Sequence, residues 1–92
     1  MKYENNKYFR ISNFYAACFL FSRGLELTNI EPVSPRRSEF VFIDAPERET
    51  LLSVYNFGKE DCSDVMVDAR KFATAIKLLK EKLYQKQSEY DD

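Results

Sequence analysis

The stretch SNFYAACFLFSRG, residues 12–24, decides the fold of this chain. Its ends are typical of a helix, because Ser12 or Asn13 can cap the first turn and Gly24 can adopt the left-handed conformation that follows the last turn. No charged residue interrupts Phe14 to Phe21, so the helix is apolar almost all the way round. A helix of this kind must be buried by the rest of the chain.

The length and composition fit a single domain. The chain has 92 residues, of which 45% are hydrophobic. A chain of this size buries about 60 to 65% of its unfolded surface, which leaves little for a second core. We expect one domain over residues 8–86, preceded by a flexible N-terminus at 1–7 and followed by an acidic, frayed tail at 87–92.

The cysteines and apolar segments indicate the compartment. Cys18 and Cys62 have neither the spacing nor the context of a metal pair or a disulfide framework, which favours free thiols in a reducing cytosol. Residues 1–7 lack the apolar core of a signal peptide, and the run 14–21 is too short to span a bilayer. We therefore expect a soluble, cytoplasmic protein with no membrane partner.

Two strands and a connection are predicted after the first helix. Alternating apolar and polar residues from Leu25 to about Glu31 indicate a half-buried strand. Two prolines and a serine in residues 32–37 predict a connection outside any helix or sheet ladder. The run Glu39–Ile43 is typical of a covered central strand, so the pair forms a hairpin with a basic tip. Residues 7–11 form either a short strand or an extended lead into the first helix.

The residues after the hairpin predict a second helix. Asp44 is placed as its N-cap, Pro46 falls in the first turn, where its missing N–H costs nothing, and Glu47 completes a capping box. Asn56-Phe57-Gly58 ends this helix, with Gly58 as the expected left-handed residue.

The remaining chain predicts a short strand and a long helix. Val65–Val67 is apolar and forms the strand, and Asp68 caps a final helix that runs to about Gln85. Its core stripe repeats at steps of three and four residues: Phe72, Ala73, Ile76, Leu79 and Leu83. The sequence therefore predicts a small α+β domain of order α-β-β-α-(β)-α, with the helices packed on one face of a small antiparallel sheet.

A set of short motifs resembles a family of short bacterial and phage domains of unknown function. The motifs are FYAA (14–17), RGLEL (23–27), FVFIDAPE (40–47), YNFG (55–58), VDARKF (67–72) and LLKEKLY (78–84). They consist of caps, glycines and core positions, so the resemblance implies the fold and supplies no active site. Phe57 departs from the polar residue expected before the glycine. An occurrence in phages would imply a nucleic-acid or host-factor partner.

Catalytic signatures are missing from the sequence. The chain has no histidine, and with only Gly24 and Gly58 it has no glycine-rich phosphate loop. We expect no enzyme, no catalytic residue, no cofactor and no metal. The acidic loop from Glu60 to Asp64 leaves a Mg²⁺ site open as an alternative to a solvated loop. Cys62 has no histidine partner, and the carboxylates around it do not favour a thiolate.

The net charge of −1 is unevenly distributed along the chain. It is +2 over residues 1–43, −4 over 44–64, +4 over 65–86 and −3 over 87–92. The chain therefore lacks the global basic field of many nucleic-acid binders, although a local basic stripe can still bind phosphate.

Seven residues are candidate contacts for nucleic acid or a protein partner. Arg36 and Arg37 lie at the predicted hairpin tip, from which guanidinium groups can reach phosphates. Lys71, Lys82 and Lys86 share one flank of the last helix, where lysines also commonly extend beside a core. Arg10 lies near the aromatic residues Tyr3, Tyr8 and Phe9, which could stack on bases or cover a sheet edge. Leu78 is an exposed aliphatic residue that could contact a partner or belong to a satellite core.

Two binding hypotheses, and one catalytic hypothesis, follow from these residues. The first is a small non-enzymatic binding module of phage or mobile-element origin that engages nucleic acid through the basic hairpin tip and the lysines of the last helix. The alternative is a protein-binding adaptor or inhibitor of a host or defence complex, such as a CRISPR-like one, acting through the acidic middle segment and apolar faces. A homodimer is compatible with both. A metal-dependent enzyme using the loop 60–64 is a third hypothesis.

Overall fold

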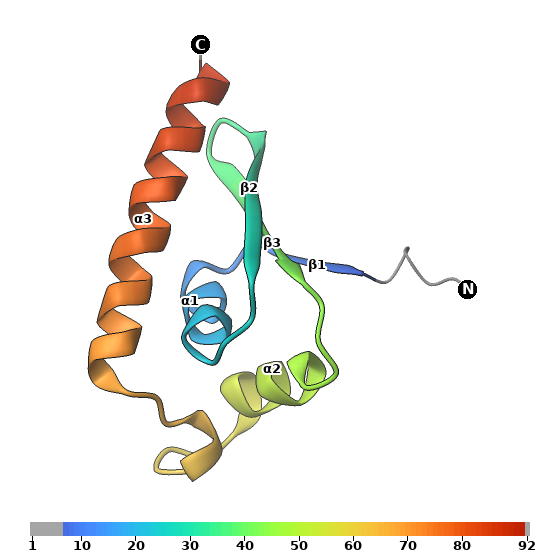
Figure 1. The fold of residues 1–92 in the computed structure, drawn as a ribbon, viewed down its shortest axis with the longest axis vertical. Helices are drawn as coiled ribbons and strands as arrows, with labels where there is room; N and C mark the ends of the chain where they lie inside the picture. Colours follow the sequence, from blue (N-terminus) through green and yellow to red (C-terminus); the bar gives the residue numbers. More distant parts are fainter. Residues whose placement is uncertain (1–6, 92) are drawn as a thin grey trace.

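The computed structural model describes residues 7–91, in which three helices pack with a three-stranded antiparallel sheet (Figure 1). The elements are β1 (Tyr8–Ile11), α1 (Phe14–Ser22), β2 (Leu27–Ser34), β3 (Arg37–Ile43), α2 (Arg48–Phe57), the short 3₁₀ helix η2 (Ser63–Val65) and α3 (Ala69–Asp91). The predicted α+β class is confirmed.

The sheet is built around β3, with the strand order β1-β3-β2. Successive side chains of a strand point to opposite faces, and Phe40 and Phe42 of β3 point into the core formed with α1 and α3. Ile30 and Leu27 of β2 stand opposite them in register. Figure 1 shows α1 and α3 on one side of the hairpin, while α2 packs against α1.

Helix α1 lies at the centre of the core, as its sequence requires. Ala16 to Leu20 are all buried. The helix begins as predicted, because Asn13 Oδ1 accepts a hydrogen bond from the backbone N–H of Ala16 at 2.9 Å, and it ends before Gly24, whose φ is +104°. Tyr15 is the exception, since its side chain is exposed.

The hairpin connection is shorter than predicted. Strand β2 continues to Ser34 and the turn consists of Pro35 and Arg36 alone. Pro32 pairs with Ser38 of β3, so the expectation that residues 32–37 stay out of the ladder is wrong. The physical reason is that β2 is an edge strand, where a missing N–H can face away from the sheet.

Two further predictions concern short strands, of which one is present and one is absent. Residues Tyr8–Ile11 form β1 and pair with β3. Of the two predicted alternatives, a short strand or an extended lead into the first helix, the strand is therefore the one observed. The predicted strand Val65–Val67 is absent: this segment holds the end of η2 followed by extended backbone. It lies next to α1 and away from the sheet, because Arg23 Nη1 donates a hydrogen bond to Asp64 O at 2.8 Å.

Helix α2 begins later than predicted. It starts at Arg48, and its N-cap Glu47 makes no side-chain cap bond, so neither the Asp44 cap nor the capping box forms. Asp44 instead accepts hydrogen bonds from Arg48 Nε at 2.9 Å and Nη2 at 3.1 Å, and from the N–H of Ala45 at 2.9 Å. The i,i+4 ion pair competes with the cap for the same carboxylate.

We expect the Asp44–Arg48 pair to make stability depend on acid pH. The hydrogen bonds from Arg48 are the main cause that lowers the pKa of Asp44 below its ordinary value of 3.8. Because the pKa is lower in the folded state, this stabilisation is present above the unfolded pKa and is lost as the pH falls through the folded pKa. Asp44→Asn should therefore lower the urea midpoint at pH 7, and the difference from wild type should shrink as the pH is lowered from about 5 to about 2.

Glu47→Gln is the matched control for this prediction, because it removes the same charge from a side chain without a cap bond. Its urea midpoint should follow that of the wild type over the acid range. A difference between Asp44→Asn and wild type that stays constant with pH would contradict the role of the ion pair.

The end of α2 also differs from the prediction. Gly58 has φ −68°, so it is not the left-handed residue; among non-glycine residues of the described chain, Asp61 has a positive φ, of 69°. A Cβ atom at position 58 would lie 2.5 Å from the carbonyl oxygen of Val54. Glycine is therefore needed here for a close backbone approach.

Helix α3 is capped as predicted but is longer. Asp68 Oδ1 accepts a hydrogen bond from the N–H of Lys71 at 3.0 Å, and the helix runs to Asp91, past the expected end near Gln85. The side chain of Gln87 donates to Ser38 Oγ and so holds this part of the helix against β3. The tail predicted to fray at 87–92 is helical through Asp91, while residues 1–6 of the predicted flexible N-terminus lie outside the described residues. No described helix is long and apolar enough to cross a membrane.

Candidate nucleic-acid interface

A groove lies between the hairpin tip and the C-terminal half of α3, which run side by side in Figure 1. Its volume is about 540 Å³. We call it the tip groove; it is lined by Ser12, Phe14, Pro35, Arg36, Arg37, Ser38, Phe40, Leu83, Tyr84 and Gln87. Apolar residues from three distant parts of the chain thus meet two arginines in one concave surface.

Local sequence places the two arginines at the rim of the tip groove. Pro35 and Arg36 form the turn, and proline suits a turn because its φ is preset. Arg37 opens β3, and both arginine residues are exposed. Neither has an ion-pair partner among the side chains that the structure describes. Their guanidinium groups are available to an anionic ligand.

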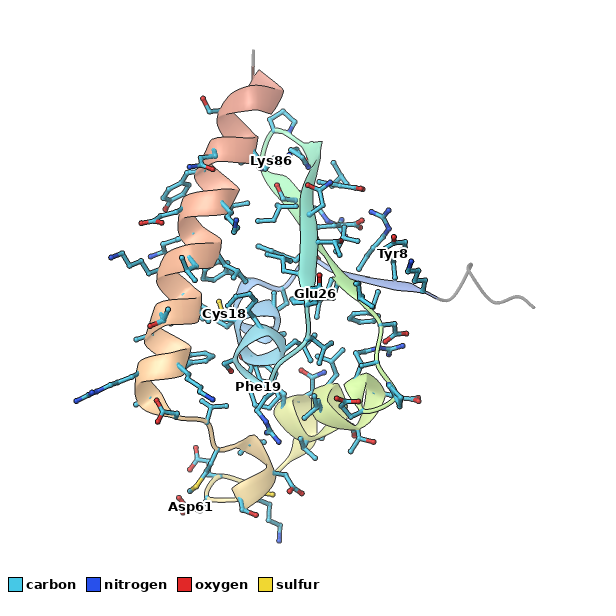
Figure 2. The ribbon with its side chains drawn as sticks, in the orientation of Figure 1. Tyr8, Cys18, Phe19, Glu26, Asp61 and Lys86 are labelled. Atoms are coloured by element: carbon cyan, nitrogen blue, oxygen red, sulfur yellow. The ribbon has the colours of Figure 1, made fainter. Side chains whose placement is uncertain are left out.

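Lys82 and Lys86 border a second hollow, on the other flank of α3. It measures about 300 Å³ and lies between the helix and the open edge of β2, where Leu27, Thr28, Asn29, Ile30 and Gln85 complete its lining. We call it the edge hollow. Figure 2 shows Lys86 beside the hairpin. Its charge is one of the causes that lower the pKa of Glu31, after the larger effect of Arg10, so Lys86 also contributes to the fold's own electrostatics.

Lys71 is not part of this region. It lies in the first turns of α3 and borders a different depression, with Arg70, Thr74 and the end of α1. Fifteen residues separate Lys71 from Lys86, which corresponds to about 22 Å along a helix. The lysine flank predicted from helical periodicity therefore divides into two groups, because the angular position of a residue says nothing about its distance along the axis.

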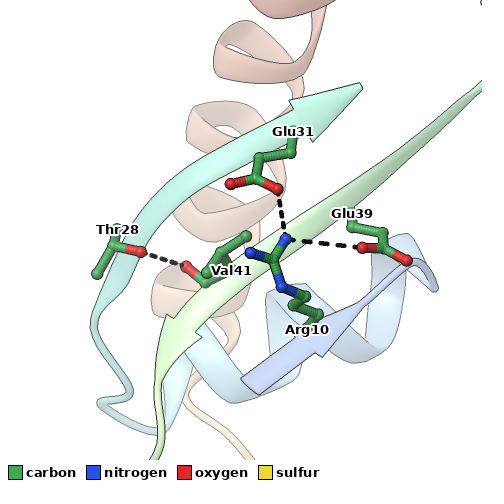
Figure 3. Close-up of polar contacts among 5 residues, drawn as sticks. All are labelled: Arg10, Thr28, Glu31, Glu39 and Val41. Atoms are coloured by element: carbon green, nitrogen blue, oxygen red, sulfur yellow. Dashed lines mark hydrogen bonds and ion pairs between the residues drawn. The ribbon is translucent and has the colours of Figure 1, made fainter. Parts of the chain in front are cut away.

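Arg10 is already paired within the protein. Its Nη1 donates to Glu31 Oε1 and lies 3.8 Å from Glu39 Oε1 (Figure 3). The hydrogen bond is the main cause that raises the pKa of Arg10 and lowers that of Glu31. Arg10 stands beside Val41, on the sheet face that α1 and α3 leave uncovered. It is separate from the tip groove, and a ligand phosphate would have to displace two carboxylates.

The N-terminal aromatic residues do not form a single stacking surface. Phe9 is covered by the guanidinium of Arg48, which lies 4.0 Å from the ring centroid. Tyr8 is exposed, with Lys7 Nζ at 5.7 Å from its ring. Tyr3 lies outside the described residues.

Leu78 is exposed as predicted from the sequence, and the structure adds further exposed apolar residues. Leu78 is 36% exposed, whereas Phe57 is 84% exposed and Tyr84 is 63% exposed. Tyr84 and Phe14 border the tip groove, and sequence reasoning assigned neither to the site. The sequence does contain a signal for each exposed ring. Tyr84 lies off the apolar stripe of the last helix, and Phe57 occupies a position where a polar residue is expected.

Two observations bear on the metal-site and thiol alternatives among the described residues. Among them, no group of three or more histidine, cysteine, aspartate or glutamate side chains could hold a metal ion, which includes the loop 60–64. Cys18 is turned from α1 toward α3 (Figure 2), and burial raises the pKa of its thiol to about 11. The thiolate needed for nucleophilic chemistry is therefore scarce at neutral pH.

Comparison with known proteins identifies a family for this chain. The model of a family described as Domain of unknown function (DUF5659) matches residues 6–85. Neither a curated protein nor a solved structure matches the chain. The matched span contains the whole sheet, α1, α2 and most of α3. The chain therefore belongs to the DUF5659 family, whose function is unknown.

Proposed function

We propose that this chain is a small non-enzymatic module that binds nucleic acid through the tip groove and the lysines of the edge hollow. The observation that carries the proposal is the position of Arg36 and Arg37, exposed and without described ion-pair partners, at the rim of a groove with an apolar floor. A phage or mobile-element origin, based on the motif resemblance, is part of the same proposal.

Nucleic acid suits the tip groove because both of its chemical parts have a counterpart there. Guanidinium groups bind phosphate oxygens with two parallel hydrogen bonds. Exposed aromatic rings such as Tyr84 stack on bases of any sequence. Lys82 lies on the other flank of the same helical segment and adds a further phosphate contact.

We expect binding to be strongly salt-dependent and to require the tip arginines. Log affinity falls as log salt rises, and each lost phosphate contact reduces the steepness of this fall by about 0.7 to 0.9. The double substitution Arg36→Ala/Arg37→Ala should therefore reduce the steepness by about 1.5 and weaken binding about 10-fold or more at low salt. Fluorescence anisotropy with labelled single- and double-stranded DNA and RNA, over a salt series starting near 50 mM, measures both quantities.

The control is Lys59→Ala/Lys77→Ala, which removes two positive charges from exposed residues outside the tip groove and the edge hollow. It should retain nearly the wild-type slope. Binding that does not change with salt, an equal effect of both double variants, or no binding at the lowest salt would overturn the proposal.

A further inference from the structure

The segment from Phe57 to Met66 carries both exposed apolar side chains and exposed carboxylates. Phe57, at the end of the helix, is 84% exposed, and Met66, after η2, is 58% exposed. The backbone at Gly58 lies against Val65, so the end of α2 and η2 pack together. The exposed acidic residues Glu60, Asp61 and Asp64 lie in the connection between Phe57 and Met66. We call these five residues the acidic knob.

The acidic knob and the tip groove are complementary. The groove combines an apolar floor, including Phe14, Phe40 and Leu83, with two arginines at its rim. A protein segment that fits it needs an apolar side chain with carboxylates nearby, which describes Phe57 followed by Glu60 and Asp61. Opposite charges at the rim of an interface set its orientation and speed its formation.

The two surfaces cannot meet within one molecule. Figure 1 places the hairpin tip beside the C-terminal end of α3 and the loop after α2 at the opposite end of the fold, and Figure 2 shows Asp61 and Lys86 at these two ends. Any pairing of the acidic knob with the tip groove must therefore join two copies.

We infer that the acidic knob of one copy docks into the tip groove of a second copy, head to tail. Phe57 covers the apolar floor, and the carboxylates of Glu60 and Asp61 face Arg36 and Arg37. Because the two surfaces differ, the interface is heterologous, and each complex keeps one free acidic knob and one free tip groove unless a ring closes. A surface of five residues is small, so the association is weak and depends on concentration.

Two variants, each lacking one side of the interface, test this directly. Phe57→Ser/Glu60→Lys removes the aromatic ring of the acidic knob and reverses one of its charges, and Arg36→Ala/Arg37→Ala removes the two positive charges of the tip groove without creating a partner for the new lysine; all four residues are exposed, and circular dichroism checks that both variants fold. In analytical ultracentrifugation up to about 1 mM, the wild type should form species beyond the dimer, whereas each variant alone should stay monomeric. Their equimolar mixture should form a dimer and stop there, because only one complementary pair remains.

The matched control is Tyr8→Ser/Glu81→Lys, which likewise removes an exposed aromatic ring and reverses one exposed charge, at residues outside both the acidic knob and the tip groove, and should associate like the wild type. A monomeric wild type, association of either variant alone, or failure of the mixture to dimerise would overturn the inference. If the true partner of the acidic knob is a different protein, the mixture will also fail to dimerise, because it contains only variants of this chain.

This inference goes beyond nucleic-acid binding and fails separately from it. Because both ligands use the tip groove, an oligonucleotide should dissociate the assembly, and Phe57→Ser/Glu60→Lys should bind the oligonucleotide like the wild type. Head-to-tail assembly without oligonucleotide binding would overturn the proposed function alone. Oligonucleotide binding by a protein that stays monomeric would overturn the self-association alone.

Discussion

Phe42→Ala is expected to lower the free energy of unfolding by about 3 to 5 kcal/mol. Phe42 is fully buried on the central strand β3, stands opposite both Phe9 and Leu27 in register, and belongs to the same core cluster as α1. Truncation removes the transfer free energy of the ring and leaves a cavity that the strands on both sides cannot easily close. Because a domain of this size is stabilised by roughly 5 to 14 kcal/mol, a large share of its stability is lost.

Equilibrium unfolding in urea measures this loss. Val33→Ala is the control on the same sheet, because Val33 is exposed on β2 and should change stability by less than about 0.5 kcal/mol. Phe42→Leu keeps most of the volume and should cost less than the alanine change, so it reports on the same site if Phe42→Ala fails to fold. A loss below about 1 kcal/mol for Phe42→Ala would contradict the central role of this ring.

Gly58→Ala is expected to be the second most damaging of these substitutions, at about 1 to 3 kcal/mol. The new methyl group would lie 2.5 Å from the backbone oxygen of Val54, which also accepts the N–H of Gly58 at 2.8 Å. A backbone atom cannot move away as a flexible side chain can, so the last turn of α2 must open or shift. An unstrained change from glycine to alanine would instead stabilise the protein by about 0.4 to 1 kcal/mol.

Gly24→Ala is the informative comparison, because the two glycines are required for different reasons. Gly24 has φ +104°, and a Cβ there would meet nothing within 4 Å. Its cost comes from backbone strain alone and should be about 1 to 2 kcal/mol. Urea unfolding of both variants measures the difference. A stabilised Gly58→Ala variant would show that the close approach to Val54 is not maintained in solution.

The basic residues show how far a candidate site can be read from the sequence. The hairpin tip with Arg36 and Arg37 follows from local features, namely a proline turn between two strand patterns. That Arg10 lies outside the candidate site could not be predicted from local features. Its partner Glu31 is 21 residues away in the sequence, and the two side chains meet because β1 and β2 flank β3. The distance between Lys71 and Lys86 follows from their spacing on one helix. Only the tertiary structure shows that β2 lies beside the half of α3 that carries Lys82 and Lys86.

The sequence by itself determined the elements whose causes are local. The burial of α1, the Asn13 and Asp68 caps and the left-handed Gly24 each depend on residues within about one helical turn or on an uninterrupted apolar run. The caps act through hydrogen bonds between residues close in the sequence, and an uninterrupted apolar run requires burial whatever element covers it, so these features can be read without knowing the long-range contacts.

Only the tertiary structure decided which of several local possibilities was used. Pro32 enters the ladder because β2 is an edge strand, Asp44 pairs with Arg48 where a cap was predicted, and Gly58 is needed for its closeness to Val54. The tip groove is of the same kind, since its floor brings together residues 14, 40 and 83. Sheet position, cross-strand partners and concave surfaces arise from contacts between residues far apart in the chain, and no local pattern encodes them.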